Sequence, residues 1–265
     1  MCRAVILVAL LALSSATACL NPQADQASPC QSQAEDPNAI QAVLADLQGR
    51  AAGLTFYQSK LDYVVRQPVL ESQARRRGTL YYARFDDRSY LRIDFNTLQY
   101  DQEKEQKYRE QYLFDGIWLT YISYEARSVQ RQQMAEPNQP VDAFALVSRR
   151  VPILGFSKIE DLQNQFDIEL VRPGETDPSA PRQLRMKVKP DSVYKDDYVT
   201  IDFQIDNKQG LPTKVVAVTT EQDVHEILLI DARINREIRR NVFAIEIPRD
   251  FSVETIPLDK SREPR

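Results

Sequence analysis

The residues of this chain that could carry catalysis are few and stand far apart in the sequence. It has one histidine, His225, which precedes Glu226 and the apolar run 227–230. Nucleophilic catalysis needs a Ser, Cys or Thr beside an oriented base, and the sequence has no G-x-S-x-G motif or other nucleophile signature. A lone histidine within an apolar strand is typical of a packed side chain, and we interpret His225 in this way.

The sequence also lacks the residue patterns typical of metal binding, phosphate binding and acid–base catalysis. A single histidine without a cysteine cluster cannot furnish a structural zinc site, and the sequence has no glycine-rich phosphate loop. The carboxylate pairs Asp86-Asp87 and Asp196-Asp197 stand in predicted turns, where aspartate forms local hydrogen bonds, so a glycosidase acid and base are not indicated. We therefore expect no metal, no other cofactor and no enzyme. The alternative is an exported hydrolase, which would need a polar pocket around His225 or a perturbed carboxylate.

The charges of the chain exclude one class of partner. The formal net charge is −4, so no basic surface is indicated for a phosphate backbone, and we expect no nucleic-acid binding. The run Arg75-Arg76-Arg77 is the densest basic cluster in the predicted sheet. We interpret it as a solvated strand start that protects an edge, not as a ligand site.

The N-terminus has the features of an export signal. Arg3 precedes a short apolar core at 4–13, and small residues follow. An A-x-A site ending at Ala18 fits ordinary signal peptidase, whereas the three residues ending at Cys19 resemble a bacterial lipobox, with Ala16 where Leu is usual. The second cleavage would leave a lipid-modified Cys19, and both stay open. We expect a signal peptide at 1–18, a flexible linker at 19–36 and a single domain at 37–265.

Beyond the linker, the pattern is that of one helix followed by many strands. Asp36-Pro37 supplies an N-cap and a proline in the first turn, and apolar residues recur at helical spacing to about Gly49 or Gly53. Asp115-Gly116 predicts a two-residue hairpin. Strands are predicted at 55–66, 73–85, 88–96, 107–114, 117–121, 127–132, 167–172, 183–189, 198–205, 213–220, 224–234 and 242–247. Because no long helices separate them, we expect an antiparallel meander.

One strand, from Gly78 to Arg84, needs more cover than the others. Alternate residues of a strand point to opposite faces, and here both sets are largely apolar: Leu80 and Tyr82 on one, Tyr81, Ala83 and Phe85 on the other. A sheet with one wetted face does not need this pattern, so we expect a second layer to cover the strand. The apolar, helix-like interlude at 141–156 is the predicted cover.

Three motifs stand in a fixed order along the predicted sheet: Gly78-x-Leu80-Tyr-x-x-Arg84, Phe114-Asp-Gly-x-Trp118 and Phe243-x-Ile-x-Ile-Pro248. With the preceding helix and the interlude, this order resembles the LolA family of bacterial lipoprotein carriers over roughly 39–256. The resemblance implies an α+β, mainly β fold: an incomplete antiparallel β-barrel of about 11–12 strands. It also implies an N-terminal helix and a helical lid that covers an apolar cavity.

The resemblance implies roles for individual residues as well. Arg84 matches the arginine that latches the lid through hydrogen bonds to lid carbonyls, although Phe85 stands where the family usually has proline. The residues expected to line the cavity are Leu80, Tyr82, Leu91, Ile93, Phe95 and Trp118. The residues expected to form the lid are Phe144, Val147, Val151, Ile153 and Leu154.

A carrier of this kind would hold acyl chains in the periplasm of a diderm bacterium for transfer to the outer membrane. Its partners would be acylated lipoproteins or lipid acyl chains, an inner-membrane release complex and an outer-membrane acceptor, and we expect a monomer. If Cys19 is acylated, a membrane-tethered acceptor resembling LolB, or an envelope sensor of lipoproteins, fits better than a diffusing carrier.

Overall fold

The computed structural model describes residues 37–86, 88–143, 159–171 and 181–258. All described residues belong to one compact unit, 35–265. The helical elements are α1 (Pro37–Ala52), α3 (Ile159–Gln165) and the 3-10 turns η1 (Pro68–Leu70) and η2 (Arg240–Phe243). The strands are β1 (Phe56–Gln67), β2 (Ser72–Phe85), β3 (Arg88–Tyr100), β4 (Gln106–Phe114), β5 (Trp118–Ser123), β6 (Ser128–Gln133), β7 (Phe166–Val171), β8 (Arg182–Val188), β9 (Tyr198–Ile205), β10 (Pro212–Thr219), β11 (Val224–Ile234) and β12 (Ser252–Ile256).

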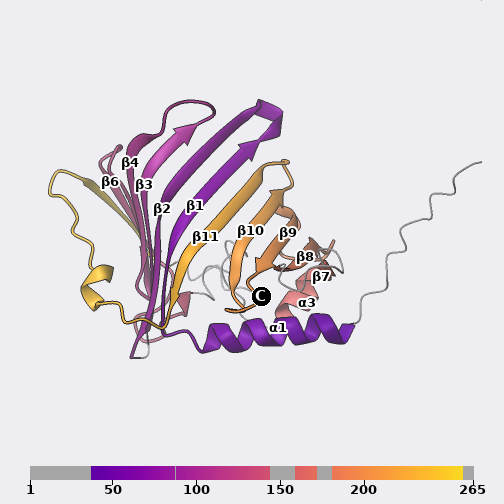
Figure 1. The fold of residues 1–265 in the computed structure, drawn as a ribbon. Helices are drawn as coiled ribbons and strands as arrows, with labels where there is room; N and C mark the ends of the chain where they lie inside the picture. The colour runs from indigo at the N-terminus through magenta and orange to yellow at the C-terminus, as the bar shows by residue number, and fades with distance from the viewer. Residues whose placement is uncertain (1–36, 87, 144–158, 172–180, 259–265) are drawn as a thin grey trace, which may run out of the picture. The chain divides into compact units, whose positions relative to one another are not determined.

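The twelve strands form one open sheet in the order β12-β6-β5-β4-β3-β2-β1-β11-β10-β9-β8-β7 (Figure 1). Every pairing is antiparallel except that of β12 with β6, which is parallel. β7 and β12 are the two edges, so the sheet does not close on itself. The prediction of an incomplete antiparallel barrel of 11–12 strands is therefore confirmed, with one parallel pair that the sequence did not predict.

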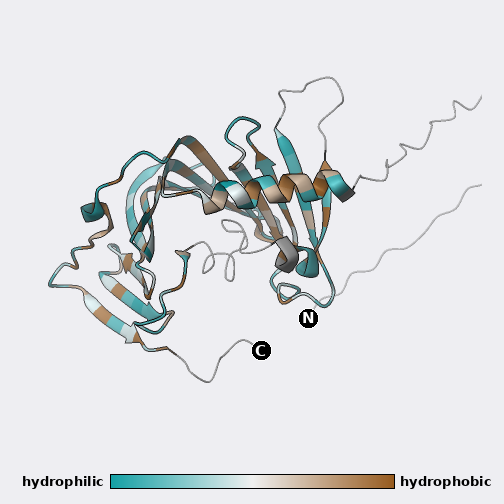
Figure 2. Ribbon diagram, turned by 90° about the horizontal axis from the view of Figure 1, so that it is seen from below, coloured by the Kyte–Doolittle hydropathy of each residue, from teal (hydrophilic) through white to brown (hydrophobic). Residues whose placement is uncertain are grey.

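The helix α1 covers one face of the sheet. It begins at Pro37, whose fixed φ suits the first turn, and its apolar residues Val43, Leu44 and Leu47 are all at most 5% exposed. They pack in one cluster with strand residues that include Leu184 and Phe203. Figure 2 shows α1 lying across the strands, with apolar and polar residues alternating around it. We call the face that α1 covers the inner face and the other one the outer face.

Gly78 lets β2 and β3 approach closely at a bulge. The pairing of the two strands shifts register between Arg77 and Gly78, and Gly78 pairs with Phe95. A Cβ atom at Gly78 would lie 1.9 Å from the carbonyl oxygen of Asp94, a distance that no side chain tolerates. The glycine of the first motif is thus required by backbone contact.

The hairpin between β4 and β5 turns one residue later than predicted. Asp115 N–H donates to the Trp118 carbonyl at 3.2 Å, so Gly116 and Ile117 are the two central residues. Gly116 has φ +91°, the positive value that the first central position of a type II′ turn demands. The Asp115 carboxylate accepts from the N–H groups of Ile117 and Trp118, which fixes the turn.

The apolar outer face of β2 is covered by a segment far along the chain. Ala83 and Leu113 are buried against Ile238 and Phe243, with Tyr81, Phe85, Val242 and Ile245 packed around them. The segment comprises the η2 turn and its flanks, which Figure 1 shows to the left of the strands in orange to yellow. The predicted cover at 141–156 lies almost entirely outside the described residues, and this face is covered by residues 238–245, which the sequence did not indicate.

The strand predicted at 242–247 is absent for the same reason. Its alternating apolar residues pack flat on the outer face, and Arg92 Nη1 donates to the Val242 carbonyl, which occupies the backbone acceptor that a strand partner would use. The last strand is instead β12, a few residues later. Within the described part of the chain, no helix is long and apolar enough to cross a membrane.

Candidate functional site

Five of the six residues predicted to line a cavity share the inner face. Cross-strand partners point to the same side, and the register pairs Tyr82 with Leu91 and Leu80 with Ile93 across β2 and β3. Phe95 follows at the same parity. Leu80, Tyr82, Leu91 and Phe95 are at most 8% exposed, and Ile93 is half-buried between two apolar clusters. Together with α1, they give the inner face a continuous apolar surface.

Trp118, the sixth residue, lies on the outer face. Its neighbour Leu119 pairs with Phe114, which belongs to the inner cluster of Leu80 and Leu91. Trp118 therefore points the opposite way, where the Arg131 guanidinium sits 5.0 Å above its ring. The prediction that Trp118 lines the same surface is wrong. The hairpin motif could have predicted this. A two-residue turn at 116–117 places Trp118 opposite Asp115, and Asp115 points away from the face of its neighbour Phe114.

Arg84 lies at the end of the inner face where α1 meets β1. Its Nη1 donates to the carbonyl of Ala52, the last residue of α1, and its Nη2 is 3.5 Å from the Asp142 carboxylate. Beside them, burial and the nearby Asp142 raise the pKa of the Tyr82 hydroxyl to about 12. Arg84 therefore joins the helix end, the sheet and the residue that begins the apolar interlude.

The predicted lid residues, Phe144, Val147, Val151, Ile153 and Leu154, lie outside the described residues, as does Cys19. Two buried residues near 144–158, Ala143 before it and Leu162 after it, pack in clusters of the inner face. Ala143 is fully buried beside Leu91, with its N–H bonded to Ser89 Oγ at 2.7 Å, and Leu162 is 9% exposed in the cluster of α1. The latch role of Arg84 stays a prediction.

A row of aromatic rings crosses the inner face above this apolar surface. The ring centroids are 6.0 Å apart for His225 and Tyr63, 6.2 Å for Tyr63 and Phe95, 6.3 Å for Phe95 and Tyr112, and 4.9 Å for Tyr112 and Tyr121. Tyr63 on β1 contacts Phe95 on β3 diagonally across β2, where Phe95 pairs with Gly78, which has no side chain to separate the rings. The row connects five strands and ends at β5.

His225, the lone histidine, is a member of this row. Its Nδ1 is 2.7 Å from the Tyr63 hydroxyl, and burial lowers its pKa, although Asp223 acts in the opposite direction. This geometry fits the packed side chain that the sequence predicted. Among the described residues, no group of three or more His, Cys, Asp or Glu side chains is placed to hold a metal ion.

An ion pair that the sequence did not indicate lies beyond the row. Arg76 points to the inner face, where its Nε is 3.6 Å from Glu110 Oε2, and the Tyr112 hydroxyl donates to Glu110 Oε1 at 2.8 Å. Burial and Glu110 raise the pKa of Tyr112, and the same two causes raise that of Tyr121 to about 12. The interpretation of 75–77 as a solvated edge is wrong, since β2 is central and Arg76 is only 27% exposed. Because side chains alternate between the faces of a strand, the middle one of three successive arginines must point to the face opposite the other two.

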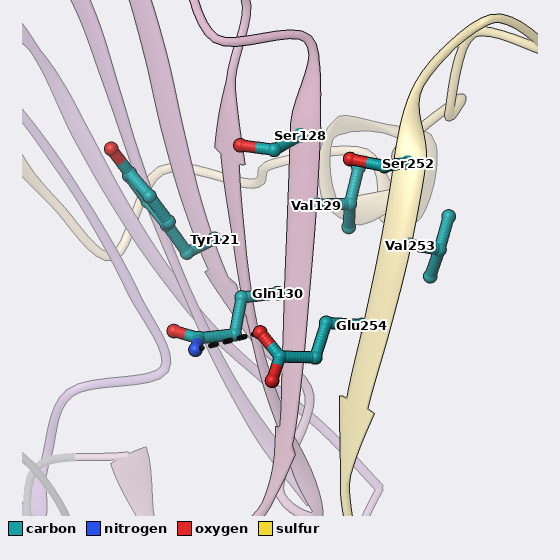
Figure 3. A pocket seen from close by; sticks show the side chains of 7 residues that line it. All are labelled: Tyr121, Ser128, Val129, Gln130, Ser252, Val253 and Glu254. Atoms are coloured by element: carbon teal, nitrogen blue, oxygen red, sulfur yellow. Dashed lines mark hydrogen bonds between the residues drawn. The ribbon is translucent and has the colours of Figure 1, made fainter.

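A pocket of about 300 Å³ lies at the β12 edge of the sheet. It is lined by Tyr121, Ser128, Val129, Gln130, Ser252, Val253 and Glu254 (Figure 3). Gln130 Nε2 donates to Glu254 at 3.4 Å across the parallel strand pair. Tyr121 belongs to both the aromatic row and the pocket wall, and Ser128, Gln130, Ser252 and Glu254 add polar side chains to that wall.

Comparison with known proteins gives likenesses of structure only. No protein-family model matches the chain, and no curated protein matches its sequence. Similar solved structures include an uncharacterized conserved protein from Thermus thermophilus (11% identity, 82% of this chain, 99% of that chain, TM-score 0.47). Others are the lipoprotein LppX of Mycobacterium tuberculosis (10%, 77% and 99%, 0.42) and a LolA superfamily protein of Nitrosomonas europaea (12%, 77% and 97%, 0.35). The similar structures thus include the family that the motifs resemble, but at these identities they place no functional residue.

Proposed function

We propose that this protein is a periplasmic carrier that holds the acyl chains of lipids or lipoproteins on its inner face for transfer to the outer membrane. The observation that carries the proposal is the inner face itself. Leu80, Tyr82, Leu91, Ile93 and Phe95 stand side by side on one side of an open sheet. The motifs that resemble the LolA family, with the export signal, supply the compartment and the cargo class.

The physical basis of carriage is the removal of acyl chains from water. Each methylene that leaves water contributes about 0.8 kcal/mol, so a chain needs an extended apolar surface rather than a few polar contacts. An open sheet can widen or narrow at its edges, because β7 and β12 are not bonded to each other. Release then needs only a modest rearrangement of weak contacts.

Arg84 is the residue we assign to control of that rearrangement. Its two contacts, at 3.5 Å, are long for hydrogen bonds, and its side chain is 40% exposed, so each contributes about 1 kcal/mol or less. Such contacts break easily when cargo or a partner competes for the guanidinium. Replacing Arg84 by Leu should leave the fold intact and change the rate of cargo release. Unchanged uptake and release would show that Arg84 is no latch.

The carrier proposal can be tested by site-specific photocrosslinking to lipid. A photoreactive phenylalanine analogue at Ile93 should crosslink to radiolabelled acyl chains when the protein is loaded in the periplasm. The matched control is the same analogue at Trp118, a half-exposed position on the outer face. Equal labelling at both positions, or none at Ile93, would reject an acyl site on the inner face.

The role of the carrier depends on the mature N-terminus. Mass spectrometry of the exported protein would find either an unmodified chain or a diacylglyceryl group on Cys19. A diacylglyceryl Cys19 would replace the diffusing carrier by a tethered acceptor or envelope sensor that uses the same inner face. The exported hydrolase remains a distinct candidate, and turnover of acyl esters that is lost in His225→Gln would support it.

A further inference from the structure

One atom of each member of the Arg76–Glu110 pair lacks a hydrogen bond, although the Tyr112 hydroxyl donates to the other carboxylate oxygen of Glu110. The 3.6 Å between Arg76 Nε and Glu110 Oε2 exceeds a hydrogen bond. Both atoms are buried, and neither has a hydrogen-bond partner within the described part of the chain. The Glu110 side chain is only 6% exposed. A buried polar atom without a hydrogen bond lowers stability, so the pair is poorly explained as a device that holds the sheet together.

The place of the pair fits the polar end of a lipid. Arg76 and Glu110 lie on the inner face as the direct cross-strand partners of Tyr63 and Phe95, two members of the aromatic row, and Phe95 shares its face with Leu91 on the same strand. Tyr121, the last ring of the row, also lines the pocket of Figure 3, whose wall carries the polar side chains of Gln130 and Glu254. A lipid whose acyl chains cover the apolar surface would therefore bring its headgroup to this pair.

The charges of the pair favour a headgroup that carries both signs. An anionic headgroup would be attracted by Arg76 but repelled by Glu110, and a cationic one the reverse, at close range in a poorly solvated site. Arginine provides several N–H donors for a phosphate, and Glu110 Oε2 is an acceptor for an N–H donor. A headgroup with a phosphate and a protonated primary amine serves both.

We propose that Arg76 and Glu110 form a subsite for the phosphoethanolamine headgroup of a phospholipid. The phosphate oxygens accept from the Arg76 guanidinium, and the ammonium donates to Glu110 Oε2. This inference rests on the proposed function, since it assumes that the acyl chains of the same lipid occupy the inner face. It adds a headgroup preference that an apolar surface alone cannot provide.

The test is a competition for lipid uptake. The purified protein is incubated with vesicles of equal parts phosphatidylethanolamine, phosphatidylcholine and phosphatidylglycerol with identical acyl chains, and the bound lipids are quantified by mass spectrometry. We expect phosphatidylethanolamine to be enriched about tenfold over phosphatidylglycerol and severalfold over phosphatidylcholine, which has no N–H to donate. Uptake in the ratio of the vesicle would overturn the headgroup subsite and leave the carrier function standing. No uptake of any lipid would overturn both.

Variants test the separate contributions of Glu110 and Arg76 to the headgroup preference. Glu110→Gln should abolish discrimination between phosphatidylethanolamine and phosphatidylcholine and increase the share of phosphatidylglycerol. Arg76→Gln should lower uptake of all three phospholipids. The matched control is Asp62→Asn, which neutralises a similarly buried carboxylate on the outer face and should leave the bound lipid ratio unchanged. A changed ratio in the control would mean that the variants act through the fold.

A second measurement needs no variant and so does not depend on folding of the mutants. The wild-type protein is offered phosphatidylethanolamine with one, two or three N-methyl groups in the same vesicles. Uptake should fall as N–H donors are removed, with the largest drop at the third methyl. Uptake that is independent of methylation would reject the Glu110 contact.

Discussion

Arg75 and Arg76 are neighbours in the chain, point to opposite faces of β2, and do different work. Both pair with a carboxylate that is 6–7% exposed, and the arginine side chains are 35% and 27% exposed. On the outer face, Arg75 bonds Asp62 through Nε at 2.8 Å and through Nη2, and Arg77 adds a third contact. On the inner face, Arg76 reaches Glu110 only at 3.6 Å. At equal burial, the satisfied pair stabilises the fold, and the unsatisfied one is available to a ligand.

The largest effect is expected at Gly78, where the backbones of β2 and β3 approach closely and support both faces of the sheet. Gly78→Ala would push a Cβ atom to within 1.9 Å of the Asp94 carbonyl oxygen, so β2 and β3 must separate at the bulge. We expect a loss of about 4 kcal/mol or more in the free energy of unfolding, measured by urea denaturation. Gly49→Ala is the control, because nothing lies within 4 Å of a Cβ there. Similar stability of the two variants would contradict the close approach.

The comparison of the two ion pairs can be made quantitative by double-mutant cycles. Arg75→Met with Asp62→Asn should give a coupling energy of about 2 kcal/mol, because the pair is buried and bidentate. Arg76→Met with Glu110→Gln should give less than about 1 kcal/mol, because no hydrogen bond joins the two groups. Equal coupling energies would make the inner pair structural and remove the reason to seek a ligand there.

Acidification should act on the two faces in different pH ranges. For Asp62, burial favours the neutral form, but Arg75 and Arg77 outweigh it and hold the pKa below the ordinary 3.8. A carboxylate with a lowered pKa in the folded state adds stability above its unfolded pKa, and this is lost as the pH falls from about 4 through the folded value. Asp62→Asn should therefore flatten the dependence of unfolding free energy on pH below about 4.

His225 should produce the smaller effect, nearer neutrality. Burial lowers its pKa from the ordinary 6.5, so the unfolded chain takes up a proton first and stability falls as the pH drops below 6.5. His225→Gln should remove this slope. Chemical denaturation of both variants from about pH 8 to about pH 3 would check the assignment, and a slope near 6.5 that survives in His225→Gln would contradict it.

The alternation of apolar and polar residues predicted most strands of the sheet, because this pattern is visible within each strand by itself. Leu80 and Tyr82 were assigned to one face by period two alone, and the register confirms it. The placement of Trp118 on the inner face rests on its residue type, which does not indicate a face of the sheet, and this prediction is wrong. Residues 242–247 alternate like a strand, but Phe243 and Ile245 pack on the outer face of β2 instead. This tertiary contact overrides the local pattern and cannot be predicted from it.

The ion pair was missed for a related reason. A run of three arginines resembles a solvated edge by residue type alone, whereas the predicted meander already places 73–85 between 55–66 and 88–96, and the structure has these neighbours. Asp62 and Glu110 are separated from their arginines by 13 and 34 positions of the chain, so only the register brings them together. The latch role of Arg84 and the lid remain predictions.

The pairing of β1 with β11 also sets an order for assembly. It brings Tyr57 beside Ile234, whereas β1 to β6 and β7 to β11 each pair with their neighbours in sequence. Contacts between distant parts of a chain form slowly, because a long loop must close first. The N-terminal meander can therefore form before its β1 edge gains β11 as a partner. Pulse-labelling hydrogen exchange should show protection of the β2–β3 amides before those between β1 and β11, and simultaneous protection would argue against this order.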